Sequence, residues 1–219
     1  GLKVYGETCP QYLFLSEEDF EKPGDEGSKC VCSPPPRGTD NQEHIWTGLA
    51  AGTFHVLSSD HAAFKYDDVR GKKLPGASQS FRKIPNGVPG VETRLPLLFS
   101  EGVNKGRLTL QQFVALSSTN AARIYGLHPR KGTIAVGADA DIVLWDPKRR
   151  VSLTNAMLHH NCDYTPYEGR ELTGYPVMTL SRGEVVMEEA RMSGSAGRGK
   201  FLRCDRPLPA KPQIGRAHV

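Results

Sequence analysis

Phe54-His55-Val56-Leu57-Ser58-Ser59-Asp60-His61 is the stretch of sequence that decides the fold class. Its first four residues form a short apolar run that is typical of a buried strand. Residues 40–52, just upstream, carry apolar side chains at helical spacing and end in Gly52, which predicts a helix with a glycine cap. A helix followed by a strand whose carboxyl end holds an ionisable pair is the unit expected of an α/β barrel.

Asp60 and His61 are the leading candidates for chemistry. The carboxyl rim of a barrel holds catalytic groups on a rigid scaffold that is open to substrate. At that rim, either residue is suited to act as a metal ligand or a general base. The alternative is structural: Asp60 caps the following turn and His61 is merely exposed. Spacing alone leaves both readings open.

The segments upstream and downstream of this unit are expected to be less regular. Residues 4–5 and 11–15 are predicted to form short β-prone stretches. Residues 16–29 are expected to be a polar loop, and Ser33-Pro34-Pro35-Pro36-Arg37 excludes a helix because it holds three prolines. Residues 62–90 contain a connection long enough to be functional or disordered.

The pattern then predicts more helices, followed by β structure. Residues 92–103 are expected to form a helix interrupted by a proline, and Thr109-Leu-Gln-Gln112 matches a capping box. Thr119 or Asn120 is expected to cap one more helix. From about residue 126 the hydrophobic period changes to two, which predicts mostly strands.

The expected strands of this second part lie around Ile134 and Val136, then at 141–146, 177–180 and 185–187. From Arg191 onward Gly, Arg, Lys and Pro dominate, so an extended tail is expected there.

The composition argues against several functional classes. The 28 Lys and Arg residues exceed the 24 Asp and Glu residues by only four and are mostly scattered, so no nucleic-acid partner is expected. No apolar run approaches the roughly 20 residues of a membrane span, and no membrane partner is expected. Five cysteines without a Cys-x-x-Cys spacing favour reduced thiols and a cytoplasmic location. Cys9, Cys30 and Cys32 are expected to be buried thiols.

Two further segments have polar groups suited to binding a ligand. The prolines after Ser33 fix the chain and remove competing donors, so this segment presents backbone groups to a ligand or forms a stiff surface turn. Ile84-Pro85-Asn86-Gly87 either places Asn86 against a polar substrate, with Gly87 allowing close approach, or forms an ordinary Asn-Gly turn.

Two acidic or basic pairs are expected to be structural. Asp139 and Asp141 alternate like a two-carboxylate metal site, but they lie between a glycine-rich turn and a strand, so we expect turn hydrogen bonding. His159 and His160 are adjacent and cannot share one strand face, so at most one of them faces any site.

Six blocks of sequence carry a resemblance to a known family. They are residues 4–13, 33–37, 58–61, 83–92, 118–125 and 131–146. In this order they look like successive blocks of dihydropyrimidinase and D-hydantoinase, the cyclic amidohydrolases of the amidohydrolase superfamily. The resemblance covers residues 3 to about 190 and is specific because all six blocks occur in order.

The resemblance implies an α/β fold that is the C-terminal part of a metal-dependent (β/α)8 barrel followed by part of a small β-sandwich domain. Residues 1–125 would be the last strands and helices of the barrel, residues 126–190 part of the sandwich, and residues 191–219 the tail. The chain would then be the second half of a longer enzyme.

The resemblance also implies a site. In the family two divalent metals, usually zinc, are bridged by a carboxylated lysine and a hydroxide, and an aspartate that ends strand 8 is a ligand. Asp60 matches that aspartate, while the chain contains no His-x-His pair, so the remaining ligands would lie upstream of Gly1. Ser33 and Asn86 match positions whose main-chain groups bind the ureide part of the substrate.

The implied reaction is ring opening of dihydropyrimidines or 5-substituted hydantoins to N-carbamoyl amino acids. Asp60 would accept a proton from water and deliver it to the leaving ring nitrogen. The family implies a small cyclic ureide as substrate, a role in pyrimidine catabolism and a homotetramer for the complete enzyme. The isolated chain is expected to be inactive, because one carboxylate does not hold a binuclear site.

Two other interpretations stay open from sequence. The first is a dihydropyrimidinase-related protein that keeps the fold, lacks competent metal sites and acts in assembly or signalling; Asp60 and His61 argue weakly against it. The second is an allantoinase or dihydroorotase, against which the blocks Gly6-Glu-Thr-Cys-Pro10 and Ile84-Pro-Asn-Gly87 argue.

Overall fold

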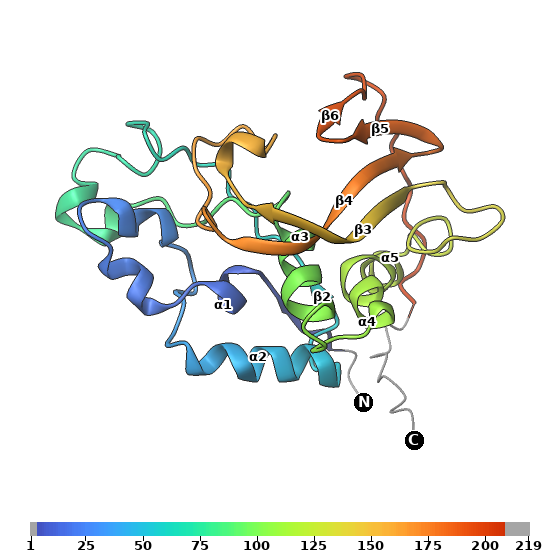
Figure 1. Cartoon of the computed structure of the whole chain (residues 1–219), viewed down its shortest axis with the longest axis horizontal. Coiled ribbons are helices and arrows are strands. Elements are labelled where there is room, and N and C mark those ends of the chain that lie inside the picture. The colour runs from blue at the N-terminus through green and yellow to red at the C-terminus, as the bar shows by residue number, and fades with distance from the viewer. Residues whose placement is uncertain (1–3, 209–219) are drawn as a thin grey trace.

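The computed structural model describes residues 4–208, which form a two-stranded parallel sheet, a four-stranded antiparallel sheet and helices that pack between them (Figure 1). The strands are β1 (Glu7–Thr8), β2 (Val56–Leu57), β3 (Ile142–Ser152), β4 (Glu171–Ser181), β5 (Glu184–Glu188) and β6 (Arg191–Met192). The α-helices are α1 (Gln11–Phe14), α2 (Asp40–Ala51), α3 (Arg94–Leu98), α4 (Leu110–Val114) and α5 (Asn120–Ile124). The 3-10 helices are η1 (Glu17–Glu21), η2 (Glu26–Cys30), η3 (Ala77–Gln79), η4 (Phe81–Lys83) and η7 (Asn155–Met157), and the π-helical turns are η5 (Phe99–Val103) and η6 (Ala115–Thr119).

The parallel pair β1 and β2 is the part of the fold that positions the candidate site. Glu7 lies opposite Val56, and the pairing continues past both strands, where the Ser58 N–H donates to the Thr8 carbonyl at 3.0 Å. Parallel strands present their carboxyl ends at the same edge of a sheet. The residues that follow β1 and β2 therefore lie side by side.

Helix α2 connects toward β2 as the sequence predicts, and it ends at Gly52 in the left-handed conformation. Its buried Trp46 packs edge-on against Phe14 of α1, with ring centroids 6.0 Å apart. The helical α1 shows that the prediction of β structure for residues 11–15 is wrong. Pro10 tolerates a helix start because its missing N–H is not needed there, and the packing of Phe14 outweighs the β preference of the aromatic residues.

The polar segment 16–29 also departs from the expected loop, because it contains η1 and η2. Side-chain capping explains the first of these: Ser16 and Asp19 form a reciprocal capping box that satisfies backbone N–H groups at the start of the helical turn.

The helical segment after residue 92 runs through Pro96, which occupies the first turn of α3, where a proline costs no hydrogen bond. The prediction of an interruption near Pro96 is wrong, because α3 continues directly into the π-helical turn η5. The capping box at Thr109 is confirmed, since the Gln112 N–H donates to Thr109 Oγ1 at 3.2 Å.

The prediction that Thr119 or Asn120 caps a separate helix is wrong, because α4, η6 and α5 follow one another without a break. Both side chains bond outside the helix. Thr119 Oγ1 donates to the Gly132 carbonyl at 2.7 Å, and Asn120 Nδ2 donates to the His55 carbonyl at 2.9 Å.

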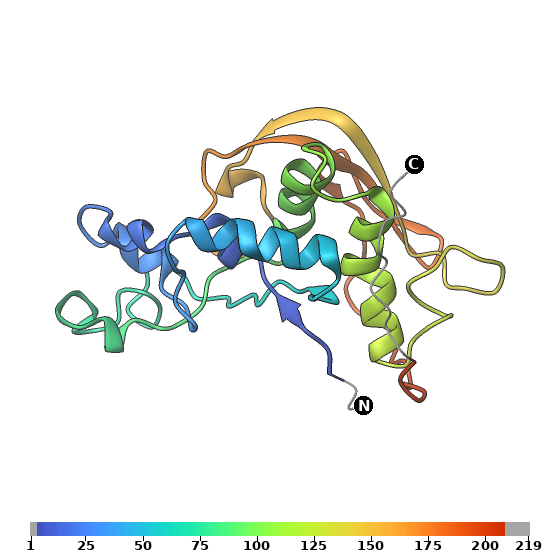
Figure 2. The ribbon, with the colours of Figure 1, turned by 90° about the horizontal axis from the view of Figure 1, so that it is seen from below.

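The antiparallel sheet has the order β3-β4-β5-β6, and its long strands β3 and β4 arch over α3 (Figure 2). Trp145 of β3 stacks against Phe99 with centroids 4.8 Å apart. Gly174 of β4 has a positive φ of 91°, and a Cβ there would lie 2.4 Å from the Phe99 ring, so only glycine permits this approach.

Two expectations for the second half need correction or extension. Ile134 and Val136 are highly exposed and lie in turns, because Gly132 and Gly137 adopt left-handed backbone angles that break an extended strand. The segment expected to be an extended tail begins with β6, and its residues 209–219 lie outside the described part of the chain. In residues 4–208, no helix has both the length and the apolar content needed to cross a membrane.

Candidate active site

Asp60 lies at the edge where β1 and β2 end, on an exposed turn that follows β2. Its backbone has a positive φ of 45°, a conformation that Asp and Asn adopt more readily than most residues. Gln11, which follows β1, is 1% exposed, and its Nε2 donates to Asp60 Oδ2 at 2.7 Å. The parallel pair therefore brings together two polar side chains that are 49 residues apart.

The contact of Gln11 with Asp60 has no local signature in the sequence, because it depends on the pairing of β1 with β2. Parallel strands place the residues beyond their carboxyl ends at the same edge of a sheet. The neighbouring Cys9 and Ser58 show the same geometry, with Cys9 Sγ 3.2 Å from Ser58 Oγ.

His61 is half-buried and orders the next loop. Its Nδ1 accepts the backbone N–H groups of Gly90 at 3.1 Å and of Val91 at 3.4 Å, and its backbone bridges to Val88. Nδ1 is thus an acceptor and carries no proton in this geometry. Its ring also lies edge-on to His160 at 6.1 Å. The structure shows that His61 orders this loop and is not merely exposed, while its role as a metal ligand or general base stays a prediction.

Ser33 and Asn86 are brought together by the fold. Ser33 Oγ donates to Asn86 Oδ1 at 3.1 Å, and the Gly87 N–H donates to the Val31 carbonyl at 3.0 Å. Both side chains are exposed and line an open groove of about 860 Å³. Asp60 is not among the residues that line this groove.

The three thiols near these loops are buried and free, as the sequence predicts. Burial raises the pKa of Cys9 and of Cys30 to about 11, and that of Cys32 to about 12. Since the thiolate is the nucleophilic form, these side chains are inert near neutral pH.

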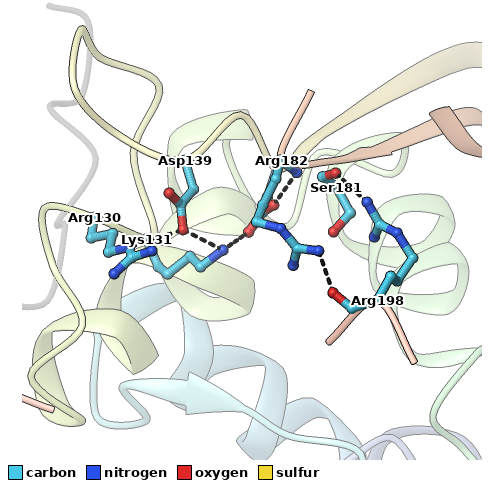
Figure 3. A network of polar contacts seen from close by, with 7 residues as sticks. Arg130, Lys131, Asp139, Ser181, Arg182 and Arg198 are labelled. Carbon is cyan, nitrogen blue, oxygen red and sulfur yellow. Dashed lines mark hydrogen bonds and ion pairs between the residues drawn. The ribbon is translucent and has the colours of Figure 1, made fainter. Parts of the chain in front are cut away.

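Asp139 and Asp141 form a second acidic cluster, and Figure 3 shows Asp139 with the basic residues around it. The Lys131 ammonium group lies between the two carboxylates, 2.9 Å from Asp139 Oδ2 and within ion-pair distance of Asp141, and Arg130 Nε lies 3.1 Å from Asp139. Asp141 Oδ1 also accepts the Arg182 N–H at 2.8 Å. The two carboxylates are held mainly by ion pairs, and the backbone hydrogen bond to Asp141 comes from Arg182, 41 residues away, rather than from the local turn that the sequence predicts.

His159 and His160 contact different partners, which agrees with a structural role. His159 Nδ1 lies 2.8 Å from Glu92, and the hydrogen bond to this carboxylate raises the pKa of His159. His160 Nε2 lies 3.1 Å from Asn155 Oδ1, and burial lowers the pKa of His160.

The donor set for a metal is incomplete in this part of the molecule. Between residues 4 and 208, no group of three or more His, Cys, Asp or Glu side chains is arranged to hold a metal ion. Asp60 suits a metal as one exposed carboxylate, but a single carboxylate does not hold a binuclear centre.

A family model described as the amidohydrolase family matches residues 26–186, which is most of the chain. The chain belongs to the amidohydrolase family. The match includes Ser33, Asp60 and Asn86, the three site residues named from sequence.

Hydantoinases are prominent among the similar proteins within this family. D-hydantoinase of Geobacillus stearothermophilus is 48% identical over 203 residues, covering 93% of this chain and 42% of the relative. A solved D-hydantoinase from a Bacillus sp. AR9 superposes with a TM-score of 0.90 at 46% identity, covering 94% of this chain and 44% of that one. The dihydropyrimidinase from Brevibacillus agri NCHU1002 gives a TM-score of 0.88 at 45% identity, with 93% and 44% covered.

The chain thus spans less than half the length of the relatives that it matches. Its α/β structure with a small antiparallel sheet superposes on the corresponding part of amidohydrolases that have a TIM-barrel fold, so the fold class expected from sequence is confirmed.

Proposed function

We propose that this chain is part of a metal-dependent cyclic amidohydrolase that opens the ring of 5-substituted hydantoins or dihydropyrimidines. The observation that carries the proposal is the exposed Asp60 at the carboxyl edge of β1 and β2, bonded to the neutral amide of Gln11. The similarity to proteins named D-hydantoinase and dihydropyrimidinase supports the substrate class.

In the proposed reaction Asp60 exchanges a proton. Its carboxylate accepts a proton from the attacking water as the new C–O bond forms, and returns it to the ring nitrogen as the C–N bond breaks. Ser33 and Asn86, which line the same groove, would orient the ureide through their main-chain groups. The product is an N-carbamoyl amino acid.

The cofactor and the organisation of the whole protein belong to the same proposal. Two zinc ions would occupy the centre, with Asp60 as one ligand and the other ligands, including a carboxylated lysine, supplied by residues outside this sequence. Residues 1–125 would belong to the barrel, residues 126–190 to the small β-sandwich and residues 191–219 to a tail. The complete enzyme would be a cytoplasmic homotetramer.

A chimera tests the proposal. The matching segment of the Geobacillus stearothermophilus D-hydantoinase is replaced by this chain, and N-carbamoyl product is measured from hydantoin and from dihydrouracil. We expect ring opening of at least one substrate at bound-metal content equal to that of the parent enzyme. A folded chimera that holds its metal but opens neither ring would contradict the proposal and favour the non-catalytic alternative.

A further inference from the structure

Lys72 lies in the interior next to the Ser33 and Asn86 loops. Its side chain is 1% exposed, and its Nζ donates to two backbone carbonyls, that of Val31 at 2.9 Å and that of Pro85 at 2.7 Å. Val31 is two residues from Ser33, and Pro85 directly precedes Asn86. One ammonium group therefore bridges the two loops that carry the proposed ureide-binding residues.

The turn before Lys72 fixes its position. The Lys72 N–H donates to the Lys65 carbonyl at 2.9 Å, and the Gly71 N–H donates to the Asp68 carbonyl at 2.9 Å. A Cβ at Gly71 would lie 2.1 Å from the Lys65 carbonyl oxygen, so this turn closes only with glycine at that position. The backbone thus delivers the lysine side chain inward rather than to solvent.

A lysine is an unusual residue for such a position, since lysine is almost never fully buried unless it is paired. Within residues 4–208 no carboxylate lies at ion-pair distance from Lys72, and both of its hydrogen-bond partners are carbonyl oxygens. Burial lowers its pKa to about 8, against the opposing effect of Cys32 and Cys30. An apolar side chain would avoid the cost of burying a charge, but both carbonyl oxygens would then lose their hydrogen-bond donor.

We infer that Lys72 is the positioning residue of the ureide-binding pair: it holds the loops of Ser33 and Asn86 at the separation that the ring requires. The inference rests on the proposed function for its substrate, but the bridge itself is independent of catalysis. The hydrogen bonds from Gly87 to Val31 and from Ser33 to Asn86 join the same loops and depend on that separation.

The bridge is tested first without activity, on the full chain. Lys72→Met removes the donor and keeps an unbranched side chain one atom shorter than that of lysine, and Lys73→Met is the matched control because Lys73 is exposed and pairs with Asp67 at 2.9 Å. We expect amide exchange at Gly87 and in residues 31–33 to accelerate about tenfold or more in Lys72→Met only. Exchange that is equal in both variants would overturn the bridge.

The effect on binding is measured in the chimera described above. If Lys72 positions the ureide, Lys72→Met raises KM by about tenfold and leaves kcat within about threefold, while Lys73→Met changes neither. A loss confined to kcat, or a KM equal to that of the unsubstituted chimera, would overturn the positioning role. If Lys72→Met does not fold, Lys72→Gln, which keeps a donor on a shorter side chain, is measured against the same two outcomes.

The two measurements separate this inference from the proposed function. A chimera without activity refutes the proposed function, while the amide exchange of the full chain still decides whether Lys72 holds the loops together.

Discussion

Two acidic sites of the chain, at Asp60 and at Asp139 with Asp141, differ in what lies against their carboxylates. Asp60 accepts one hydrogen bond from the neutral amide of Gln11. Asp139 and Asp141 share the Lys131 ammonium group, and Arg130 adds a second positive charge beside Asp139.

This difference separates a carboxylate that has no ion pair among residues 4–208 from two carboxylates that are held in ion pairs. The hydrogen bond from Lys131 lowers the pKa of Asp139. Burial raises the pKa of Asp141, but the bonds from Lys131 and from the Arg182 N–H outweigh it and leave this pKa below its ordinary value. Closely spaced acidic residues such as Asp139 and Asp141 therefore do not by themselves indicate a metal site, because neighbouring cations account for their carboxylates.

The largest expected effect comes from removing the free carboxylate. Asp60→Asn in the chimera should lower kcat by about 10²- to 10⁴-fold, the range for loss of a general acid–base group. Asn tolerates the left-handed backbone of this position, so the fold should be retained. Product release is measured under saturating substrate.

Asp139→Asn is the matched control, and it should keep kcat within about threefold because its carboxylate is occupied by cations. Equal losses in the two variants would remove the distinction between the two sites.

A smaller effect on kcat is expected from replacing Gln11, the neutral hydrogen-bond partner of Asp60. Gln11→Leu removes the 2.7 Å hydrogen bond to Asp60 and leaves the carboxylate free to rotate, so kcat should fall by about tenfold. Gln42→Leu is the control, since Gln42 Nε2 donates to the Leu15 carbonyl at 3.1 Å. If both variants lose the same activity, the Gln11 bond has no particular role at Asp60.

The smallest effect concerns stability rather than activity. Lys131→Met leaves two neighbouring carboxylates without their shared cation, which should lower the free energy of unfolding by about 1 kcal/mol, a value limited by solvent screening at this partly exposed site. The midpoint of thermal unfolding should fall by about 2–4 °C. Lys105→Met, which removes a single ion pair with Glu101, should cost about half as much.

The loss of stability in Lys131→Met should depend on pH, and the pKa shifts of Asp139 and Asp141 give the direction of that dependence. The folded pKa values of Asp139 and Asp141 lie below their ordinary value of 3.8, so their stabilisation is complete above about pH 4 and is lost as pH falls through the folded values. The difference in melting temperature between Lys131→Met and the unsubstituted chain should be present at about pH 7 and shrink at about pH 3. An unchanged difference at the lower pH would contradict the assignment of the network.

Much of the local structure could be predicted from sequence, because its causes are local. The helix that ends at Gly52 and the capping box at Thr109 follow from spacing and from side chains within one turn. By contrast, α1 could not be predicted, because aromatic residues favour strands until Phe14 meets Trp46 and Tyr167, which lie far away in sequence.

The candidate site shows the same division. Asp60, Ser33 and Asn86 were named from sequence, but the hydrogen bond that joins Ser33 to Asn86 spans 53 residues. Gln11 and Lys72 went unnoticed because their partners are set by tertiary structure: one faces the end of a parallel strand and the other reaches two carbonyls in separate loops. A polar residue in a fully buried place has no local signature in a single sequence.

The π-helical turn η6, at Ala115–Thr119, fits one more residue into the helix than an α-helix would. Each residue turns a helix by about 100°, so this extra residue sets the direction in which Asn120 points relative to Phe113. Phe113 stays in the core while Asn120 reaches the His55 carbonyl beside β2. Deleting one residue here would give a more regular helix, but it would rotate the Asn120 side chain away from the His55 carbonyl. The hydrogen bond that joins this helix to the strand before Asp60 would then be lost.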